Sequence, residues 1–410
     1  MRVLWFSVTP SLFNPHSNSH NGGGWIASLE QIVRTDNTIQ LGIAFNFPDD
    51  GFRYVQDGVT YYPVHKQKMS IIDKLLSRDF RQKQLEQYLT IIDDFKPDII
   101  QIFGSENDFG VICGNTDIPV VIHMQGCLPP YHNALFPVGM NTMDFLIHRG
   151  LNFRYRFIGF RSESSFRRNA EREIKTIQHC KYFMGRTEWD KGLISLFNPD
   201  AEYFHCDEAL RPSFLHSEKQ WKWHDDKKKT FISIISRPWY KGSDLILKTA
   251  ELLSRFTDLD FEWRVYGIQE MRFFESKYGI KAAEVNVKVM GTASSDELVN
   301  EICKSSCYVH TSYIDNSPNS LCEAQIMGAP VLATHVGGIS SMVKDGTTGI
   351  LFPANAPYTL STLMKRIATE RNLAESLSKE ARLQALQRHN PEQIRRTLVD
   401  IYNHIINENH

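Results

Sequence analysis

The sequence lacks the features that mark metal-binding or redox proteins. It has seven cysteines in 410 residues, and none of them forms a C-x-x-C pair, which argues against a zinc ribbon or a thioredoxin-like motif. Cys303 and Cys307 are four residues apart and could share one helix face, but no second pair accompanies them. We therefore expect all seven thiols to be free, in a reducing compartment.

Net charge and long apolar runs are also missing. The formal net charge is −1, so the whole molecule has no electrostatic signature of a nucleic-acid binder. No stretch approaches the roughly 20 apolar residues that cross a bilayer. The first residues, 1–13, carry one early positive charge and no A-x-A-like cleavage site, which predicts a first strand rather than a signal peptide. We expect a cytoplasmic protein, with a peripheral position at the inner face of a membrane as the alternative.

What the sequence does contain is an alternation of short apolar strands and helical segments. At 410 residues the chain exceeds what one core usually supports. Apolar strands between helices indicate parallel sheets covered on both faces. We predict an α/β protein with two facing, doubly wound Rossmann-like domains. The predicted strands are Arg2–Val8, Ile39–Phe45, Asp98–Phe103, Val120–Met124, Tyr182–Gly185, Phe231–Ser236, Phe261–Gly267, Val287–Gly291, Tyr308–Ser312 and Val331–Val336.

The domain boundary is predicted after Arg211. The charged segment Ser217–Lys229 is typical of an exposed connection before a new first strand. The predicted parts are a first Rossmann-like domain at 1–211, a second Rossmann-like domain at 212–388 and a C-terminal helix within 389–410. Apolar residues at helical spacing give this helix one buried face, which we expect to pack back toward the first domain. They are Ile394, Leu398, Ile401, Tyr402 and Ile405.

The stretch from Thr311 to Gly338 carries the strongest functional pattern. Ser317 is a good helix N-cap, Pro318 suits the first helical position, and Gly328 ends the helix. A helix start at the carboxyl edge of a parallel sheet favours a pyrophosphate. The backbone amides predicted to face it are those of Asn319, Ser320 and Leu321.

Two carboxylates, Asp315 and Glu323, flank this helix start. They could accept hydrogen bonds from hydroxyl groups on either side of a diphosphate, one on the transferred sugar and the other on the ribose. The alternative is a capped surface helix with a solvated Asp315.

This stretch resembles the signature of the group 1 (family 4) retaining glycosyltransferases of GT-B fold, a glutamate, seven residues, and a second glutamate followed by alanine. Here Glu323-Ala324 is intact, and Asp315 stands at the first position. The segments from Gly328 and Val336 match as well, and the resemblance is strongest over 230–353. It implies a metal-independent hexosyltransferase that takes sugar from a nucleotide-diphosphate donor, expected to be a UDP-sugar. It makes 1–211 the acceptor-side domain and 212–388 the nucleotide-sugar-binding domain. It further implies no cofactor, and a glycan or lipid-linked acceptor, as in surface polysaccharide synthesis.

Cations and glycines near two other strand ends match family positions. Arg237 and Lys241 follow a strand and can converge on a diphosphate, and the resemblance assigns them to the leaving group. Two surface cations beside a turn are the alternative. In the Gly22–Gly24 run, the resemblance places Gly23 and Gly24 against the donor phosphates. A flexible turn would explain this run equally well.

The first half supplies further candidates on the acceptor side. Gln125 stands where relatives usually have a histidine that faces the transferred sugar, and His123 lies two residues earlier on the same strand. His123 could substitute in part or could be a core histidine. His20 could shape the acceptor entrance, and Arg186 and Glu188 match a family segment near the cleft.

Two further segments have competing explanations. Asp258-Leu-Asp260 spells a metal-binding pattern but falls in a polar turn, so we expect no metal site there. Residues 148–186 contain ten Lys or Arg against three Glu, interleaved with aromatics. This segment could contact an anionic membrane, grip an acceptor phosphate, or form a charged helix with inward aromatics. No nucleic-acid partner is expected.

Two alternative functions remain open at this stage. A GT-B sugar-nucleotide epimerase would need proton-transfer groups at the sugar, and Gln125 disfavours it. A nucleotide-sugar-binding subunit without catalysis is suggested only by Gln125 and Asp315.

Overall fold

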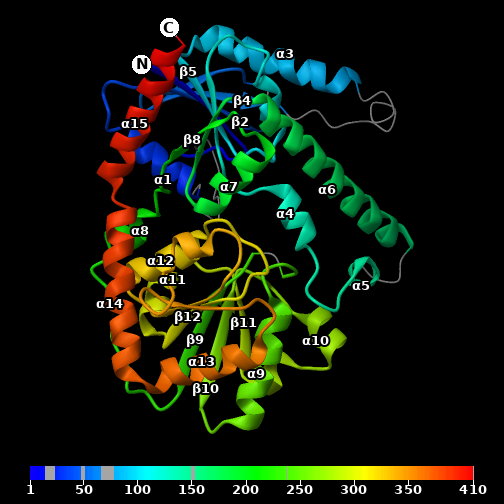
Figure 1. The fold of residues 1–410 in the computed structure, drawn as a ribbon, viewed down its shortest axis with the longest axis vertical. Coiled ribbons are helices and arrows are strands. Elements are labelled where there is room, and N and C mark those ends of the chain that lie inside the picture. Colours follow the sequence, from blue (N-terminus) through cyan, green and yellow to red (C-terminus); the bar gives the residue numbers. More distant parts are fainter. Residues whose placement is uncertain (14–23, 48–50, 66–77, 149–152, 237, 410) are drawn as a thin grey trace.

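The chain folds into two lobes that face each other, each built on one sheet. The computed structural model describes residues 1–13, 24–47, 51–65, 78–148, 153–236 and 238–409. Helices flank both sheets, and the last helix returns to the first lobe, beside the N-terminus (Figure 1). This arrangement confirms the predicted fold class of two facing doubly wound sheets.

The first lobe is built on an eight-stranded sheet of order β3-β4-β2-β1-β5-β6-β7-β8. Neighbouring strands pair in parallel, except that β3 runs antiparallel to β4. The strands are β1 Arg2–Ser7, β2 Gln40–Asn46, β3 Tyr54–Gln56, β4 Val59–Val64, β5 Ile99–Phe103, β6 Val120–His123, β7 Tyr182–Gly185 and β8 Glu202–His205.

Helices cover both faces of this sheet. Along β1, Val3 and Trp5 face one core, while Leu4 and Phe6 face the other. This alternation explains why the strand reads as a continuous apolar run. The helices are α1 Gly24–Val33, α3 Arg78–Phe95, η1 Asp108–Ile112, α4 Leu128–Asn133, α5 Thr142–His148, α6 Phe153–His179 and α7 Glu188–Phe197.

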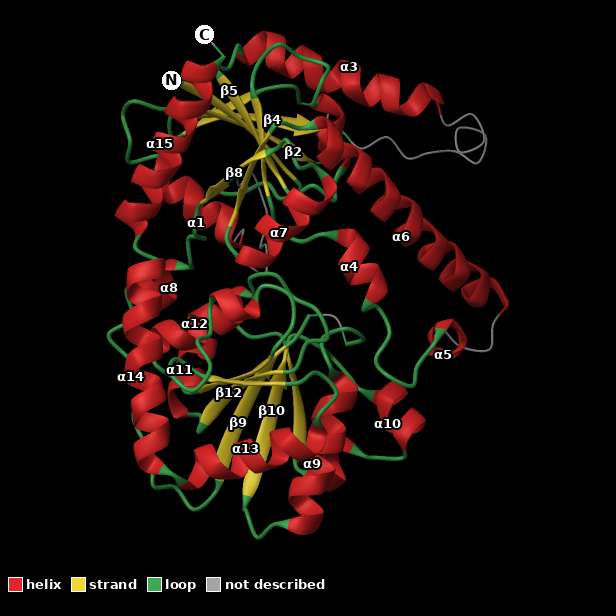
Figure 2. Cartoon of the chain, viewed as in Figure 1, coloured by secondary structure: helices red, strands yellow, loops and turns green. Residues whose placement is uncertain are grey.

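The second lobe has a six-stranded, fully parallel sheet of order β11-β10-β9-β12-β13-β14. Figure 2 shows its strands converging toward the first lobe, with helices on either side. The strands are β9 Lys229–Ile234, β10 Phe261–Tyr266, β11 Val287–Gly291, β12 Cys307–His310, β13 Val331–Thr334 and β14 Ile350–Phe352. The helices are α8 Pro212–Leu215, α9 Ser243–Phe256, α10 Arg272–Tyr278, η2 Ala282–Val285, α11 Ser295–Lys304, α12 Asn319–Met327, η3 Ile339–Ser341, α13 Pro357–Thr369 and α14 Arg371–Arg388.

The last helix, α15 Pro391–Glu408, packs on the first lobe. The apolar face read from the sequence is buried there. Trp5 Nε1 donates a hydrogen bond to the Tyr402 hydroxyl at 3.0 Å, and that hydroxyl donates to Gln101. The chain therefore crosses between the lobes twice, once on the way out and once on the way back.

Several expectations were wrong in detail. Cys113 and Cys180 form a disulfide with a Cα–Cα distance of 5.6 Å, so not all seven thiols are free. Cys303 lies in α11 and Cys307 in β12, so they do not share a helix face. The segment 217–229 is not wholly exposed, because Trp221 is buried and its indole N–H donates to Ser305 O at 2.6 Å.

All ten predicted strands are present within one to two residues of their expected ends, whereas β3, β4, β8 and β14 were not predicted. Three of these four, β3, β8 and β14, lie at sheet edges and are only three or four residues long. No helix within the described residues has the length and apolar character needed to span a bilayer.

Candidate active site

A pocket of about 250 Å³ lies between the lobes, at the carboxyl edge of the second sheet. Gly24, at the start of α1, is its wall from the first lobe. Gly267 adopts φ +92°, and a Cβ there would lie 2.3 Å from Ile235 O, so only glycine fits this turn. The lining residues are Gly24, Arg211, Ile234, Tyr266, Gly267, Thr292, Ala293, Leu298, Asn319, Ser320 and Glu323.

Glu323 and Arg211 form an ion pair in the wall of this pocket. Arg211 Nε and Nη2 donate to the two carboxylate oxygens at 2.6 and 2.7 Å, and Nη1 donates to Ser295 Oγ at 2.8 Å. Burial raises the pKa of Glu323, and the hydrogen bonds from Arg211 oppose that shift. The planar, two-point pairing fixes the carboxylate in one orientation.

Helix α12 begins at the pocket, one residue later than predicted. Its N-cap is Pro318 rather than Ser317, whose hydroxyl instead donates to Glu208 Oε1 at 2.5 Å. The Leu321 amide donates to Pro318 O at 3.0 Å and does not face a ligand. Asn319 and Ser320 do line the pocket, where the first amides of a helix have no intrahelical partner.

Asp315 is the centre of a second cluster, just before α12. Its Oδ2 accepts from Lys241 Nζ, from His310 Nε2 at 3.0 Å and from Ser312 Oγ at 3.2 Å. Lys241 and His310 hold the pKa of this carboxyl far below its usual range, against the effect of burial. A Cβ at Gly337 would lie 1.9 Å from Asp315 O, and one at Gly338 would lie 2.4 Å from Asn316 O. Both glycines are therefore needed for the backbone of 337–338 to lie against that of Asp315 and Asn316.

The first lobe presents Gln125 to the same region. Its backbone carbonyl accepts from Asn316 Nδ2 at 3.2 Å. Among the residues that the structure describes, its buried side-chain Nε2 has no hydrogen-bond partner, which costs free energy unless a ligand supplies an acceptor. Gln125 is thus a donor available to a bound molecule.

His123 and Arg186 lie in the interior. His123 is fully buried, its ring packs 5.0 Å from Trp25, and burial lowers its pKa to about 3. Arg186 stacks over Trp25 at 4.6 Å and donates to Met124 O at 3.1 Å. These contacts favour the core role for His123 over that of an acceptor contact.

The remaining predicted residues are spread out or fall elsewhere. Glu188 is in the first turn of α7 with its side chain 82% exposed, and its amide donates to Ser341 Oγ at 3.0 Å. Gly23, His20 and Arg237 lie outside the described residues. Asp258 pairs with Lys365 at 3.2 Å on the surface.

Residues 217–384 match the family model described as "Glycosyl transferases group 1". The match covers less than half of the chain. We refer to the matched segment as the group 1 domain. A D-inositol 3-phosphate glycosyltransferase of Arthrobacter sp. (strain FB24) is 34% identical over 115 residues, which is 27% of each protein. An uncharacterised glycosyltransferase of Methanocaldococcus jannaschii is 25% identical over 142 residues, 35% of this chain and 39% of that protein. The chain thus matches about a quarter to two fifths of the length of these relatives.

Solved structures share the whole architecture. Sucrose-phosphate synthase of Thermosynechococcus elongatus has a TM-score of 0.72 at 12% identity, covering 99% of both chains. Anabaena HepE in complex with UDP-glucose has a TM-score of 0.60 at 12% identity, covering 98% of this chain and 99% of that one. At such identities the likeness shows the fold, which is GT-B.

Three residues around the group 1 domain's site were missed in the sequence. Arg211 closes the pocket, His310 contacts Asp315, and Tyr131 reaches Asp315 from the first lobe, with its hydroxyl 3.4 Å from Oδ1. Arg211 and Tyr131 belong to no pattern that marks them. His310 ends a strand beside the signature, and that position was a usable signal.

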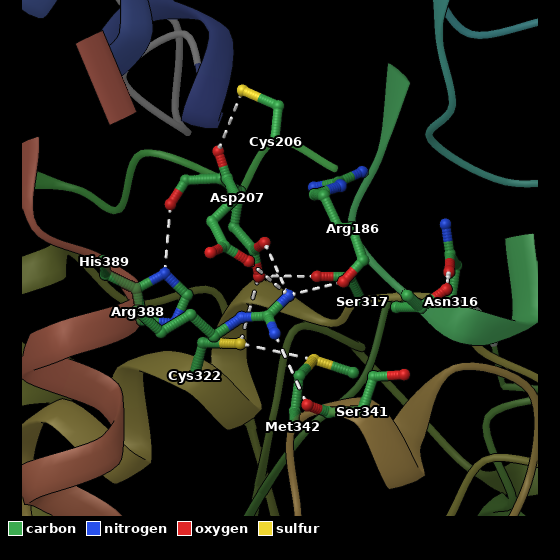
Figure 3. A network of polar contacts seen from close by, with 12 residues as sticks. Arg186, Cys206, Asp207, Asn316, Ser317, Cys322, Ser341, Met342, Arg388 and His389 are labelled. Atoms are coloured by element: carbon green, nitrogen blue, oxygen red, sulfur yellow. Dashed lines mark hydrogen bonds and ion pairs between the residues drawn. The ribbon is translucent and has the colours of Figure 1, made fainter. Parts of the chain in front are cut away.

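A buried polar network joins the group 1 domain to both chain crossings (Figure 3). Arg388 Nη2 donates to Arg186 O at 2.7 Å and lies 2.9 Å from Asp207 and 3.5 Å from Glu208 carboxylate oxygens. His389 Nδ1 lies 3.0 Å from Glu208 O. The hydrogen bond from Ser317 to Glu208 therefore links the start of α12 to the place where the lobes connect.

Glu208, Cys322 and His389 also form one of the groups among the described residues whose ligand atoms lie within 4.8 Å of one another. The Arg388 guanidinium already places positive charge beside the Glu208 carboxylate. Nearby cations lower the pKa of Glu208, while burial raises that of the Cys322 thiol. This environment favours an ion-paired network over a thiolate metal site.

Proposed function

We propose that this protein is a retaining, metal-independent glycosyltransferase that moves a sugar from a UDP-sugar to a glycan or lipid-linked acceptor. The observation that carries the proposal is the continuous wall formed by the Glu323–Arg211 pair and the start of α12. A carboxylate beside exposed helix amides suits a ribose next to a diphosphate. The HepE structures named as complexes with UDP and UDP-glucose support this donor class.

In this proposal, different residues contact different parts of the donor. Glu323 accepts from the ribose hydroxyls, while Asn319, Ser320, Gly23 and Gly24 surround the diphosphate. Arg237 and Lys241 neutralise the diphosphate as it leaves, which supplies the main catalytic term. Lys241 is held near Asp315 in this structure, so it must share its charge between this carboxylate and the diphosphate when the donor binds.

The sugar lies beyond the diphosphate, between the lobes. Gln125 and Asp315 face it from opposite sides, and the acceptor enters from the first lobe past His20 and Glu188, with Arg186 bracing the interior behind them. In this division, residues 1–211 hold the acceptor, 212–388 hold the donor and 389–410 tie the two together. Closing the lobes around both substrates excludes water from the reaction.

The protein's place in the cell belongs to the same proposal. We place it in the cytoplasm, with the basic residues of the segment 148–186, which includes helix α6, at the inner face of an anionic membrane, where a lipid-linked acceptor would lie. The support is charge alone, since the side chains of 153–163 lie outside the described residues.

A panel of nucleotide sugars tests the proposal. Purified protein should bind UDP and slowly hydrolyse one UDP-sugar to free UDP, with no loss of rate in EDTA. Inversion at C2 of the sugar would instead show an epimerase, and binding without turnover a nucleotide-sugar-binding subunit. A strict Mn²⁺ or Mg²⁺ requirement would contradict the metal-independent assignment.

A further inference from the structure

Helix α4 places one tyrosine against the second lobe. The helix begins after Cys127, and the Leu128 amide donates to Glu173 Oε2 of α6 at 2.6 Å. The His132 ring stacks on Phe166 of α6, with ring centroids 5.8 Å apart. These two contacts fix α4 on the first lobe, so that Tyr131 approaches the second lobe from a defined position.

The Tyr131 phenol lies at the junction of the lobes, beside the proposed sugar position. The centroids of the Tyr131 and Tyr240 rings are 5.4 Å apart, in an edge-on arrangement. A Cβ at Gly126 would lie 3.6 Å from the Tyr131 ring. Gly126 follows Gln125, so Tyr131 and the unpartnered Gln125 amide belong to the same wall. The Tyr131 hydroxyl lies 3.4 Å from Asp315 Oδ1.

The two oxygens of Asp315 have different surroundings. Oδ2 accepts from Lys241, His310 and Ser312, whereas within the described part of the chain Oδ1 accepts only the long hydrogen bond from Tyr131. At 3.4 Å this bond is near the limit at which a hydrogen bond has appreciable strength. An ionised oxygen with one weak donor can accept a further hydrogen bond at little cost.

A sugar hydroxyl suits this pair because it donates and accepts at once. It can donate its proton to Asp315 Oδ1 while its oxygen accepts the proton of the Tyr131 phenol. We propose that Tyr131 and Asp315 form a clamp across the lobes that recognises one ring hydroxyl of the donor sugar, with Tyr131 as a specificity-determining residue. This inference rests on the proposed function and assigns it a substrate feature.

The clamp predicts selection against deoxy sugars. A site that hydrogen-bonds a substrate hydroxyl discriminates strongly against an analogue without it, because the site's polar groups are then left unpaired. It also compensates for the shorter reach of Asp315 compared with glutamate, since the second contact comes from the facing lobe. UDP itself does not reach the clamp, so its affinity is independent of Tyr131.

Calorimetry on wild type, Tyr131→Phe and Tyr358→Phe tests the clamp with UDP, UDP-glucose and its 3-, 4- and 6-deoxy analogues. Tyr358 is 74% exposed and serves as the matched control. Wild type should bind one deoxy analogue at least about 10-fold more weakly than UDP-glucose. Tyr131→Phe should bind UDP-glucose more weakly than wild type does, by about the same factor. Its affinity for that deoxy analogue should equal the wild-type affinity for the same analogue, and its affinity for UDP should stay within about twofold of wild type.

The outcomes separate this inference from the proposed function. If wild type fails to bind UDP, the proposed function fails. If wild type binds UDP, but Tyr131→Phe keeps both the UDP-glucose to UDP ratio and the deoxy discrimination, the clamp is wrong. Should Tyr131→Phe fail to fold, the wild-type deoxy series alone decides, because equal affinity for UDP-glucose and all three analogues rules the clamp out.

Discussion

Replacing Glu323 by glutamine should lower the affinity for UDP more than it lowers the free energy of unfolding. In the structure both carboxylate oxygens accept from Arg211, at 2.6 and 2.7 Å, and each keeps a lone pair for a ribose hydroxyl. Glutamine offers one oxygen and places an amide donor against the guanidinium. The ribose thus loses a charged acceptor, and Arg211 loses its alignment at the pocket wall.

The expected loss follows from the type of bond removed. Hydrogen bonds to charged groups contribute roughly 1.5–3 kcal/mol, so UDP should bind about 10- to 150-fold more weakly. Stability should change less, by under about 2 kcal/mol. The reason is that burial disfavours the charged form of Glu323, as its raised pKa indicates, so removing the charge relieves part of the cost of losing the pair.

Calorimetry with UDP and guanidinium unfolding measure the two effects. Glu375→Gln is the matched control, because Glu375 pairs with Arg371 at 2.9 Å on an exposed helix face. Such pairs contribute little, so this variant should keep wild-type affinity and stability within about 0.5 kcal/mol. A folded Glu323→Gln protein that binds UDP within twofold of wild type would refute the ribose assignment.

Four other outcomes are expected. Lys241→Ala should lower the free energy of unfolding in guanidinium by about 2–4 kcal/mol, because it leaves the buried Asp315 carboxylate without its ammonium partner. Adding Asp315→Asn should restore part of that free energy of unfolding but none of the enzymatic turnover. Burial raises the pKa of Glu173 to about 8, so the folded state keeps a proton that the unfolded chain loses near its ordinary pKa of 4.5. Thermal stability should therefore fall as pH rises from about 5 to about 8, and Glu173→Gln should flatten that slope; an equal slope in both proteins would contradict this. Arg388→Gln should cost about 3–5 kcal/mol in unfolding free energy, because it strands the Glu208 carboxylate in the interior, and a loss under about 1 kcal/mol would contradict that. If residues 148–186 dock on membrane, binding to anionic vesicles should fall steeply with salt, since exposed charges are screened beyond about 8 Å, and should drop without loss of UDP affinity on replacing Arg154, Arg156 and Arg161 by Gln.

The sequence was most informative where structure depends on near neighbours. Central strands are apolar on both faces and stand out. The edge strand Glu202–His205 has polar ends, and the edge strand Ile350–Phe352 is apolar but only three residues long. The Ser317 prediction was wrong because a buried carboxylate distant in sequence, Glu208, takes its hydroxyl. Local capping preferences cannot anticipate that competition.

In the candidate site, too, local sequence patterns predicted some residues but not their partners distant in the chain. Glu323 and Asp315 were predicted from their spacing to a helix start. In the structure Glu323 lines the pocket, and Asp315 lies near Tyr131 of the first lobe. Their partners were not found, because Arg211 is 112 residues from Glu323 and Lys241 is 74 from Asp315. The Cys113–Cys180 disulfide spans 67 residues and likewise leaves no local mark. Pairing at such separations depends on topology, which spacing alone does not encode.

The return of α15 to the first lobe has a consequence for synthesis of the chain. Trp5 lies in the first strand, yet its indole bonds to Tyr402, and the core around it includes Leu398 and Ile405. During translation one apolar face of the first lobe therefore stays uncovered until the ribosome has synthesised the entire second lobe and then α15. Domains emerging from the ribosome usually fold as units in order, but here the second lobe can complete its core before the first. The exposed face of the early lobe is the surface that a chaperone would bind in the interval.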